Sequence, residues 1–480
     1  MQRITSATAI DLFDIAASRR IEQAAAAALP PHTLMQRAGL AVARLAMAVA
    51  PHARTVWIAS GPGNNGGDGF EAAAQLQQRG FASIVTRIGD DSHLPPDARA
   101  SLQRALDAGV CFADVPPRHS DLAIDALLGI GTSRPPQGLM ADWLQRMHKG
   151  PGSVLSVDTP SGLNADTGVL PMDLAAATGR RLCLSLLTLK PGLFTAQGRD
   201  AAGEVWFDDL GVGPGLQSAT ARLPGAPAAA RRLHASHKGS YGDVAVIGGA
   251  PGMAGAALLA AGAALGAGAG RVFVAPLDVD VATLDVLQPE LMFRRIETLD
   301  LAAMTVVCGC GGGQAVREVL PRVLETAGAL VLDADALNAI ASDAALQNLL
   351  RARSKPDRTT VLTPHPLEAA RLLGTGTAEV QGDRLSAARR LVERFGATVV
   401  LKGSGTIIAA DGQLPVINPT GNARLATAGT GDVLAGMLGA ALAAGQPVME
   451  AACQAVWRHG QLADEWPESP PLTAGALSRG

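Results

Sequence analysis

The 480-residue chain has few aromatic side chains and few cysteines. Phenylalanine, tryptophan and tyrosine make up 3% of it, so it offers little surface on which nucleic acid bases could stack. The cysteines number five, few for the length and odd, which argues against a disulfide framework and favours a reducing compartment. Lysine and arginine (40) nearly balance aspartate and glutamate (43), so no broad basic field exists to hold nucleic acid or an acidic membrane.

Long, strongly hydrophobic runs are also missing. The longest apolar run, residues 253–270, consists of alanine and glycine with some leucine, and it predicts a close-packed helix of a soluble protein. The first 18 residues lack the pattern of a secretory signal and already carry Asp11 and Asp14. Cys308 and Cys310 have no second ligand pair, so we expect small buried residues and not half of a zinc site. These features together predict a cytoplasmic protein with no membrane partner.

The length predicts two or three domains, because one core rarely serves so long a chain. Apolar residues recur at helical spacing over residues 7–29 and 33–50, which predicts a helix in each stretch. Short β-like runs then alternate with segments long enough for crossover helices, at residues 54–60, 81–88, 121–128 and 153–157. This rhythm predicts a parallel sheet covered on both faces, with binding residues at the carboxyl ends of its strands.

A second alternation of strands and helices follows a break in the pattern. Residues 211–234 are small, include three prolines and show no periodicity, so they predict a linker. Further strands are expected at residues 243–248, 271–275, 304–307, 329–332, 359–362 and 397–401. Asp411-Gly412, between two β-like runs, predicts a hairpin turn. The fold class is therefore α/β, in two domains.

A glycine-rich stretch, GPGNNGGDG at residues 61–69, comes directly after the first expected strand. Glycines there allow the close backbone approach that a pyrophosphate needs. The spacing only loosely fits the dinucleotide-binding fingerprint, and a turn capped by Asp68 is the competing interpretation.

Oxygen-bearing side chains follow two further strands. Asp125 precedes GIGTSRP, and Asp158 precedes TPSGL. Asn65, Asp125 and Ser161 could supply hard oxygen ligands to a cation, although each aspartate could equally be a helix cap.

In the second half, the stretch ATAGTGDVLAGML at residues 426–438 is typical of a phosphate-binding loop followed by a helix. Gly429 and Gly431 bring backbone N–H groups close to an anion, and a helix begins nearby. Asp432 would be held ionised by the helix dipole and could take a proton from a substrate hydroxyl. The simpler alternative is that Asp432 only caps the helix.

Four other loops of this half follow expected strands. GCGGG at residues 309–313 is an anion-sized loop, and DADALN at 333–338 opens a helix with at least one aspartate expected as a cap. TPHPLE places His365 for a substrate or structural hydrogen bond, and Glu368 within reach of a metal's water shell. KGSGT at 402–406 supplies a cation, amides and hydroxyls for nucleotide phosphates, without the spacing of a Walker A loop.

The order GPGNNGGDG, DALLGIGTSRP, SVDTPSGLNADTG and KPGL, from about residue 11 to 211, resembles the N-terminal domain of the bifunctional NAD(P)H-hydrate repair enzymes. The resemblance implies a Rossmann-like α/β/α epimerase domain with a potassium ion at Asn65, Asp125 and Ser161, and Asp158 as its proton-transfer residue. It also implies that the hydrated dinucleotide binds at Asn64, Asn65, Gly66, Gly67, Asp68, Gly129, Ile130, Gly131, Thr132, Ser133, Arg134, Pro135 and Asp158.

HKGSYG, IGGAPGMAGAA, DADALN, TPHPLE, KGSGT and GTGD, over about residues 237–464, look like the ribokinase-like ADP-dependent dehydratase domain of the same family. By this resemblance Asp432 is the acid/base residue and itself contacts the hydrate, together with Ala256, Gly313 and His365. The adenine nucleotide is then bound by Lys402, Gly403, Ser404, Gly405, Thr406 and Gly431. The chain departs from the pattern of this family at two places. Cys310 stands where the family commonly has proline, and GNARLA carries Arg424-Leu425 where proline or glycine with methionine is expected. Both differences concern the shape of the local loops.

We therefore predict an epimerase domain at residues 1–213, a linker at 214–234 and a dehydratase domain at 235–480. The expected substrates are NADHX and NADPHX, ADP and Mg²⁺ are expected at the second site, and a homo-oligomer is expected. Asp432 would deprotonate the added hydroxyl, which attacks the terminal phosphoryl group of the nucleotide, and phosphate then leaves. The alternative is a ribokinase-like small-alcohol kinase fused to a Rossmann-like binding or scaffold domain.

Overall fold

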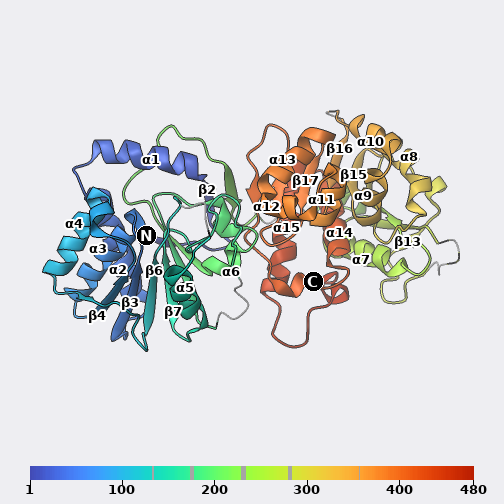
Figure 1. Ribbon diagram of the computed structural model, residues 1–480. Helices are drawn as coiled ribbons and strands as arrows, with labels where there is room; N and C mark the ends of the chain where they lie inside the picture. Colours follow the sequence, from blue (N-terminus) through green and yellow to red (C-terminus); the bar gives the residue numbers. More distant parts are fainter. Residues whose placement is uncertain (132–134, 173–177, 229–233, 279, 281–283, 356) are drawn as a thin grey trace. The chain divides into compact units, whose positions relative to one another are not determined.

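The computed structural model describes residues 1–131, 135–172, 178–228, 234–278, 280, 284–355 and 357–480. The chain forms two compact units, Met1–Arg222 and Leu223–Gly480, and each is an α/β structure (Figure 1). The division falls inside the predicted linker. Among the described residues, no helix is long and apolar enough to cross a membrane.

The first unit is built on a sheet in which all neighbouring strands are parallel except the β1–β9 pair. The strand order is β1-β9-β8-β7-β6-β3-β4-β5. The strands are β1 (Gln2–Arg3), β3 (Thr55–Ser60), β4 (Ala82–Arg87), β5 (Cys111–Phe112), β6 (Leu122–Ala126), β7 (Ser153–Val157), β8 (Arg181–Leu186) and β9 (Glu204–Asp208). From β3 the chain winds outward through β4 and β5, then returns to β6 on the other side of β3. Ligands of such sheets bind at this reversal, outside the carboxyl ends of the strands.

Helices cover both faces of this sheet, and alternating side chains of β3 face each layer. Val56 and Ile58 join the core formed with α2, α3 and α4, whereas Trp57 and Ala59 join the core formed with α5. The helices are α1 (Ile15–Ala28), α2 (Thr33–Val49), α3 (Asn64–Gln77), α4 (Pro96–Asp107), α5 (Leu139–Lys149) and α6 (Gly198–Ala202). The prediction of a parallel sheet between two helical layers is confirmed.

Two expectations for the first unit need correction. The helix predicted over residues 7–29 begins only at Ile15, because the Asp14 side chain caps it by accepting from the Ala17 N–H at 2.7 Å. The preceding residues form β2 (Ala9–Leu12) instead. Likewise, the stretch predicted as a linker contains a strand, β10 (Ala221–Pro224).

The second unit contains a parallel sheet that is extended by an antiparallel hairpin. Its strands run in the order β13-β12-β11-β14-β15-β16-β17-β18-β19. They are β11 (Asp243–Gly248), β12 (Arg271–Pro276), β13 (Met292–Phe293), β14 (Thr305–Cys308), β15 (Ala329–Leu332), β16 (Thr359–Leu362), β17 (Thr398–Leu401), β18 (Ile407–Ala409) and β19 (Val416–Ile417). The six strands expected from the sequence are all present, and the hairpin predicted at Asp411-Gly412 joins β18 to β19.

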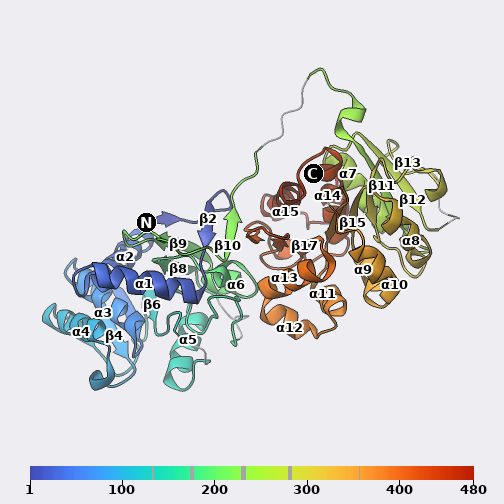
Figure 2. The same cartoon turned by 90° about the horizontal axis from the view of Figure 1, so that it is seen from above.

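Two helical layers enclose this second sheet, as Figure 2 shows. One layer holds α7 (Ala254–Gly266), α14 (Thr430–Ala443) and α15 (Val448–Asp464), with the short α16 (Ala474–Leu477) against it. The other holds α8 (Val316–Thr326), α9 (Ala334–Ala341), α10 (Ala344–Arg351), α11 (Pro366–Leu373), α12 (Thr377–Gly382) and α13 (Arg384–Phe395).

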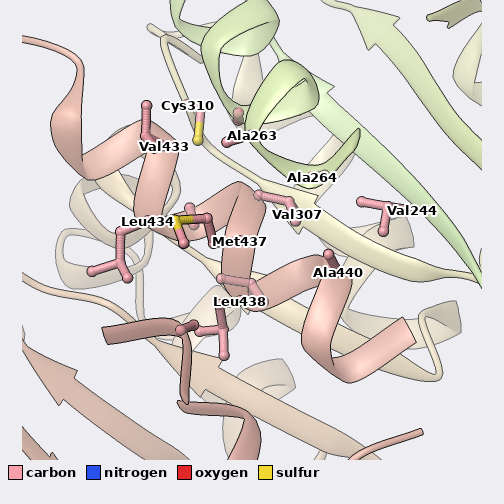
Figure 3. Packing of buried hydrophobic residues seen from close by; sticks show 14 of the residues in the cluster. Val244, Ala263, Ala264, Val307, Cys310, Val433, Leu434, Met437, Leu438 and Ala440 are labelled. Atoms are coloured by element: carbon pink, nitrogen blue, oxygen red, sulfur yellow. The ribbon is translucent and has the colours of Figure 1, made fainter. Parts of the chain in front are cut away.

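The alanine- and glycine-rich helix α7 packs closely against α14. A Cβ atom on Gly436 of α14 would lie 1.9 Å from the Ala260 carbonyl oxygen of α7, and one on Gly439 would lie 2.5 Å from the Val307 side chain. Only glycine permits this approach. Val433, Leu438 and their neighbours on α14 fill the core between α7 and the sheet (Figure 3). The packing fixes the position of α14, whose first turn carries Asp432.

Candidate active sites

A cavity of about 710 Å³ opens in the first unit where the β3 and β6 loops meet. It is lined by residues of α1 and α2, of the loops after β3, β6 and β7, and of the segment after β8. The sequence-predicted residues that line it are Asn64, Asn65, Asp68, Gly129, Ile130, Gly131 and Asp158. The structure thus brings together residues from three separate motifs.

The other predicted residues of this site are placed differently. Gly66 and Gly67 lie in the first turn of α3, and a Cβ atom on Gly66 would lie 2.0 Å from the Gly61 carbonyl oxygen. They shape the loop and do not line the cavity. Pro135 is exposed and also lies outside the lining. Thr132, Ser133 and Arg134 lie outside the described residues.

Helix α3 points its N-terminus at this cavity. Gly63 is the N-cap residue and offers no side chain, so backbone N–H groups of the first turn remain for an anion. Asp68 is the fifth residue of α3, which rules out the alternative that it caps the helix. Burial and the neighbouring Asp158 and Glu22 raise the pKa of Asp68 well above its usual value, so it favours the protonated form.

Asp158 follows β7 in a left-handed backbone conformation, with φ of 66°, which is uncommon for a residue other than glycine. Its Oδ1 atom accepts from the Leu186 N–H at 3.1 Å and from the ammonium group of Lys190. It is therefore no helix cap. Lys190 belongs to the KPGL motif, for which the sequence suggested no chemical role.

Of the three residues predicted to hold a cation, two contact each other and the third lies against the loop after β6. Ser161 donates its hydroxyl to Asp125 Oδ1 at 2.6 Å and its N–H to Oδ2 at 2.9 Å. Asn65 lies against Gly129, where a Cβ atom would lie 3.4 Å from Asn65 Oδ1. Asp125 is 3% exposed and takes part in no ion pair among the described residues, and burial raises its pKa. It is not a helix cap either.

The second unit carries a buried ion pair at the carboxyl ends of β15 and β17. Lys402 Nζ donates to Asp333 Oδ1 at 2.5 Å, and the Thr363 hydroxyl donates to the same oxygen at 2.8 Å. Asp333 occupies the N-cap position of α9, but its side chain makes no capping bond there. The sequence suggested a cap among these aspartates, whereas the tertiary structure uses Asp333 to hold Lys402.

Asp432 joins this cluster. Gly429 is the N-cap of α14 and Asp432 is its third residue, so the interpretation of Asp432 as only a cap is wrong. One carboxylate oxygen each from Asp432 and Asp333 and the Sγ atom of Cys310 all lie within 4.8 Å of one another. Burial and Asp333 raise the pKa of Asp432 to about 6, while a hydrogen bond from Cys310 opposes this rise.

Cys308 and Cys310 are both fully buried, as predicted, but the sequence did not place Cys310 beside Asp432. Cys310 belongs to the apolar cluster that also contains Val433 (Figure 3). Burial raises the pKa of the Cys310 thiol well above its usual value, and the adjacent Asp432 adds to this rise. The thiol therefore stays protonated and can donate a hydrogen bond.

The KGSGT loop follows β17 and turns over an arginine that the sequence did not single out. A Cβ atom on Gly403, whose φ is 134°, would lie 2.9 Å from the Arg384 guanidinium group. Arg384 is 1% exposed and donates to the carbonyl oxygens of Leu401 and Lys402, at 3.2 Å each. Gly403 and Ser404 are exposed, as a nucleotide-binding loop requires, Thr406 donates to the Gly403 carbonyl oxygen, and Gly431 faces Lys402 Nζ.

The residues predicted to contact the hydrate lie in the first turn of α7, in the GCGGG loop and at the start of α11. Ala256 packs against the GCGGG loop, where a Cβ atom on Gly311 would lie 2.9 Å from the Ala256 side chain. Gly313 donates its N–H to Asp335 Oδ2 at 2.8 Å. His365 follows Pro364, whose carbonyl oxygen accepts from the Lys402 N–H at 2.9 Å.

His365 and Glu368 form a capping box at the start of α11. His365 Nδ1 accepts from the Leu367 and Glu368 N–H groups, and Glu368 Oε2 accepts from the His365 N–H at 2.7 Å. Both Glu368 oxygens face His365, which does not favour the metal-water role considered from the sequence. The His365 ring is 46% exposed, and its Nε2 atom lies 3.3 Å from Glu368 Oε1.

Comparison with protein-family models finds two matches along the chain. Residues 31–192 match the family described as "YjeF-related protein N-terminus". Residues 244–478 match the family described as "NAD(P)H-hydrate dehydratase". Each match falls within one of the two compact units.

Curated relatives match both units at once. The chain is 36% identical to a bifunctional NAD(P)H-hydrate repair enzyme of Escherichia coli, over 90% of this chain and 85% of that protein. It is 46% identical to an ADP-dependent (S)-NAD(P)H-hydrate dehydratase of Neisseria meningitidis, over 52% of this chain and 84% of that protein. Among solved structures, an ADP/ATP-dependent NAD(P)H-hydrate dehydratase of Bacillus subtilis co-crystallised with ATP/Mg²⁺ is 31% identical, over 52% of this chain and 90% of that one, with a TM-score of 0.42.

Proposed function

The chain belongs to the family of bifunctional NAD(P)H-hydrate repair enzymes, and from this premise we propose how its two sites divide the repair between them. The first unit interconverts the R and S epimers of NADHX and NADPHX. The second unit dehydrates the S epimer to NADH or NADPH at the expense of ADP, releasing AMP and phosphate. The observation that carries this assignment is the convergence of Lys402, Asp333 and Asp432 at one site of the second unit.

In the second site, we propose that Asp432 is the general base. Its carboxylate takes the proton from the hydroxyl group that hydration added to the nicotinamide ring. The hydroxyl oxygen then forms a bond to the terminal phosphorus of ADP while the bond from that phosphorus to the AMP oxygen breaks. Phosphate subsequently leaves with the former hydroxyl oxygen, and loss of a ring proton restores the reduced nicotinamide.

The loop of Lys402, Gly403, Ser404, Gly405 and Thr406, with Gly431, would hold the nucleotide. Gly403 and Ser404 of this loop are exposed, and the Lys402 ammonium group supplies positive charge where negative charge develops. Ala256 from α7, Gly313 from the GCGGG loop and His365 from the start of α11 would contact the hydrate. The placement of these two sets of residues around the Lys402–Asp333 ion pair supports the assignment of one set to the nucleotide and the other to the hydrate.

Mg²⁺ is the metal expected with the nucleotide. The protein atoms nearest the reacting groups include a thiol, and Asp333 is already paired with Lys402, so they form no oxygen cage for Mg²⁺. The residues fit an ion held mainly by the nucleotide phosphates at the KGSGT loop. When bound there, it neutralises phosphate charge.

In the first site, we propose that Asp158 is the proton-transfer residue of the epimerase. The dinucleotide would lie in the cavity with its pyrophosphate at the N-terminus of α3. Residues Thr132, Ser133 and Arg134, together with Pro135, stay predicted contacts of the substrate.

A potassium ion is proposed at Asn65, Asp125 and Ser161. A buried carboxylate with no ion pair among the described residues calls for a compensating positive charge. Asn65 Nδ2 has no hydrogen-bond partner among the same residues, so the amide can turn its oxygen toward an ion. Carboxylate, amide and hydroxyl oxygens suit a hard cation.

A cytoplasmic location and a homo-oligomeric state remain predictions. No disulfide joins the five cysteines, all of which lie in the described part of the chain. The oligomeric state is measured by light scattering on the full chain.

A single assay tests the proposed function. The full chain is incubated with mixed epimers of hydrated NADH and ADP, and the reduced nicotinamide absorbance is followed. We expect complete conversion of both epimers with release of AMP and phosphate, and only epimer exchange without ADP. A stable phosphorylated product would indicate a small-alcohol kinase instead.

A further inference from the structure

Lys190 is an unusual element of the first site because it is a lysine with almost no exposure to solvent. Its side chain is 1% exposed, yet it contributes to the lining of the cavity beside Asp158. A buried ammonium group is stable only when its donors are all paired. Any role assigned to Lys190 of the KPGL motif must therefore explain why its charged group is buried.

The ammonium group uses its three donors on three different acceptors. Nζ donates to the Leu186 carbonyl oxygen at 2.8 Å, to the Ser185 hydroxyl at 3.4 Å and to Asp158 Oδ1. A carbonyl oxygen and a carboxylate oxygen can only accept, so the amine acts as the donor to both. Lys190 is therefore poorly suited to act as a base or as an amine nucleophile, both of which need a free lone pair.

The two oxygens of Asp158 differ in their surroundings. Oδ1 accepts from both Lys190 and the Leu186 N–H, whereas Oδ2 has no hydrogen bond to any described residue. The carboxylate is 15% exposed and lines the cavity. One oxygen is thus anchored and the other is available to a ligand.

We propose that Lys190 is the positioning residue of the epimerase site: its buried ammonium group holds the Asp158 carboxyl group in one orientation through Oδ1, and leaves Oδ2 to exchange a proton with the hydrated coenzyme. This inference rests on the proposed epimerase function. The left-handed backbone of Asp158 fits it, because strain at a residue persists where the surroundings hold it in place.

Lys190 is one of two cations, with Arg19, among the described residues that line this cavity, where several carboxyl groups gather. Asp158 is faced by Glu22 and Arg19 from α1 and by Asp68 from α3, and Asp97 of α4 lines the cavity beyond them. The Cys183 thiol of β8, which donates to the Asp158 carbonyl oxygen, is buried behind.

The test uses the full chain, so that the second domain provides an internal reference. Lys190→Met removes the charge, Lys190→Arg keeps it, and Asp158→Asn removes the base. Conversion of the R epimer is followed with ADP present, alongside direct dehydration of the S epimer. We expect Lys190→Met to lower kcat for R-epimer conversion about 10²-fold, the usual effect of misplacing a catalytic group, with little change in KM and normal S-epimer dehydration.

The pH profile separates positioning from a purely structural role. In Lys190→Met the acid limb of kcat/KM for epimerisation should move to higher pH, because removing a positive charge next to any carboxyl group disfavours a negative charge there, while Lys190→Arg keeps the charge and should keep the wild-type limb. If Lys190→Met does not fold, as judged by thermal unfolding, the profile and rate of Lys190→Arg, and amine rescue of Lys190→Ala by methylammonium, decide the matter.

Particular outcomes would overturn the proposal. Near-wild-type epimerisation by Lys190→Met with an unmoved acid limb, or no rescue of Lys190→Ala together with a displaced limb in Lys190→Arg, contradicts a positioning role. If the wild-type chain itself does not exchange the epimers, the epimerase function fails. If the wild-type chain exchanges the epimers and Asp158→Asn does not, while the Lys190 variants keep wild-type activity, the epimerase function stands and only the positioning role of Lys190 fails.

Discussion

Lys402 and Asp333 form an ion pair, with 2.5 Å between Nζ and Oδ1, at the site that also holds Asp432. Asp333 is 1% exposed, and its oxygen also accepts from Thr363. Burial alone would lower the pKa of Lys402, but Asp333 and Glu368 outweigh it and raise that pKa. Lys402 therefore stays charged, which is the state that a nucleotide phosphate needs.

This pairing predicts a strong coupling between the two residues. Lys402→Met should lower the free energy of unfolding of the second unit by about 3–5 kcal/mol, because it leaves a buried carboxylate without its cation. Adding Asp333→Asn should recover part of that loss, since the remaining group is neutral. Urea unfolding of the single and double variants gives the coupling energy, and additive losses would contradict the prediction.

Asp432→Asn should slow dehydration by about 10²–10⁴-fold, the usual contribution of a general base. Epimer exchange by the first unit should be unchanged and serves as the control for folding and concentration. The measurement is the initial rate of return of reduced nicotinamide from the S epimer with saturating ADP. A rate close to that of the wild type would refute the assignment of Asp432.

The pH dependence of dehydration should reflect Asp432, whose pKa burial and Asp333 raise to about 6. The base acts in its ionised form, so kcat/KM should fall as the pH drops through that value and stay level above it. Cys310→Ala removes a hydrogen bond that lowers this pKa, so the acid limb should move to higher pH. Cys310→Ser retains a donor and should leave the limb nearly in place, and an unmoved limb in Cys310→Ala would contradict this role of the thiol.

Gly436→Ala should destabilise the second unit by about 1–3 kcal/mol, as overpacking usually does. Its Cβ would lie 1.9 Å from the Ala260 carbonyl oxygen, so α7 and α14 would have to separate. Because α14 carries Asp432, the dehydration rate should fall as well. Gly382→Ala, where nothing lies within 4 Å of the added atom, is the matched control and should leave both unchanged or slightly raise stability.

Potassium should stabilise the first unit through Asp125. Thermal unfolding in potassium chloride should occur at a higher temperature than in tetramethylammonium chloride at equal ionic strength, by mass action on the folded state. Asp125→Asn should abolish this difference, whereas Asp107→Asn, which alters an exposed residue of α4, should preserve it. An equal potassium effect in both variants would exclude Asp125 as a ligand.

The sequence by itself determined the two α/β units, six strands and the hairpin of the second sheet, and the family to which the chain belongs; it did not predict β13. These depend on local properties: apolar runs of strand length, glycines at strand ends and short motifs in a fixed order. The same locality explains the error at residues 7–29, where helical spacing outweighed the capping residue Asp14 and hid β2.

Only the tertiary structure decided what Asp68, Asp158, Asp333 and Asp432 do. From the sequence, an aspartate next to the start of a helix is predicted to cap that helix. Whether its side chain bonds to the helix backbone or to a lysine far away in the sequence depends on which strand ends are neighbours in the sheet. Asp333 and Lys402 are 69 positions apart, and Asp158 and Lys190 are 32 apart. Parallel strands bring such partners together at one edge of a sheet, and burial there makes their pairing necessary.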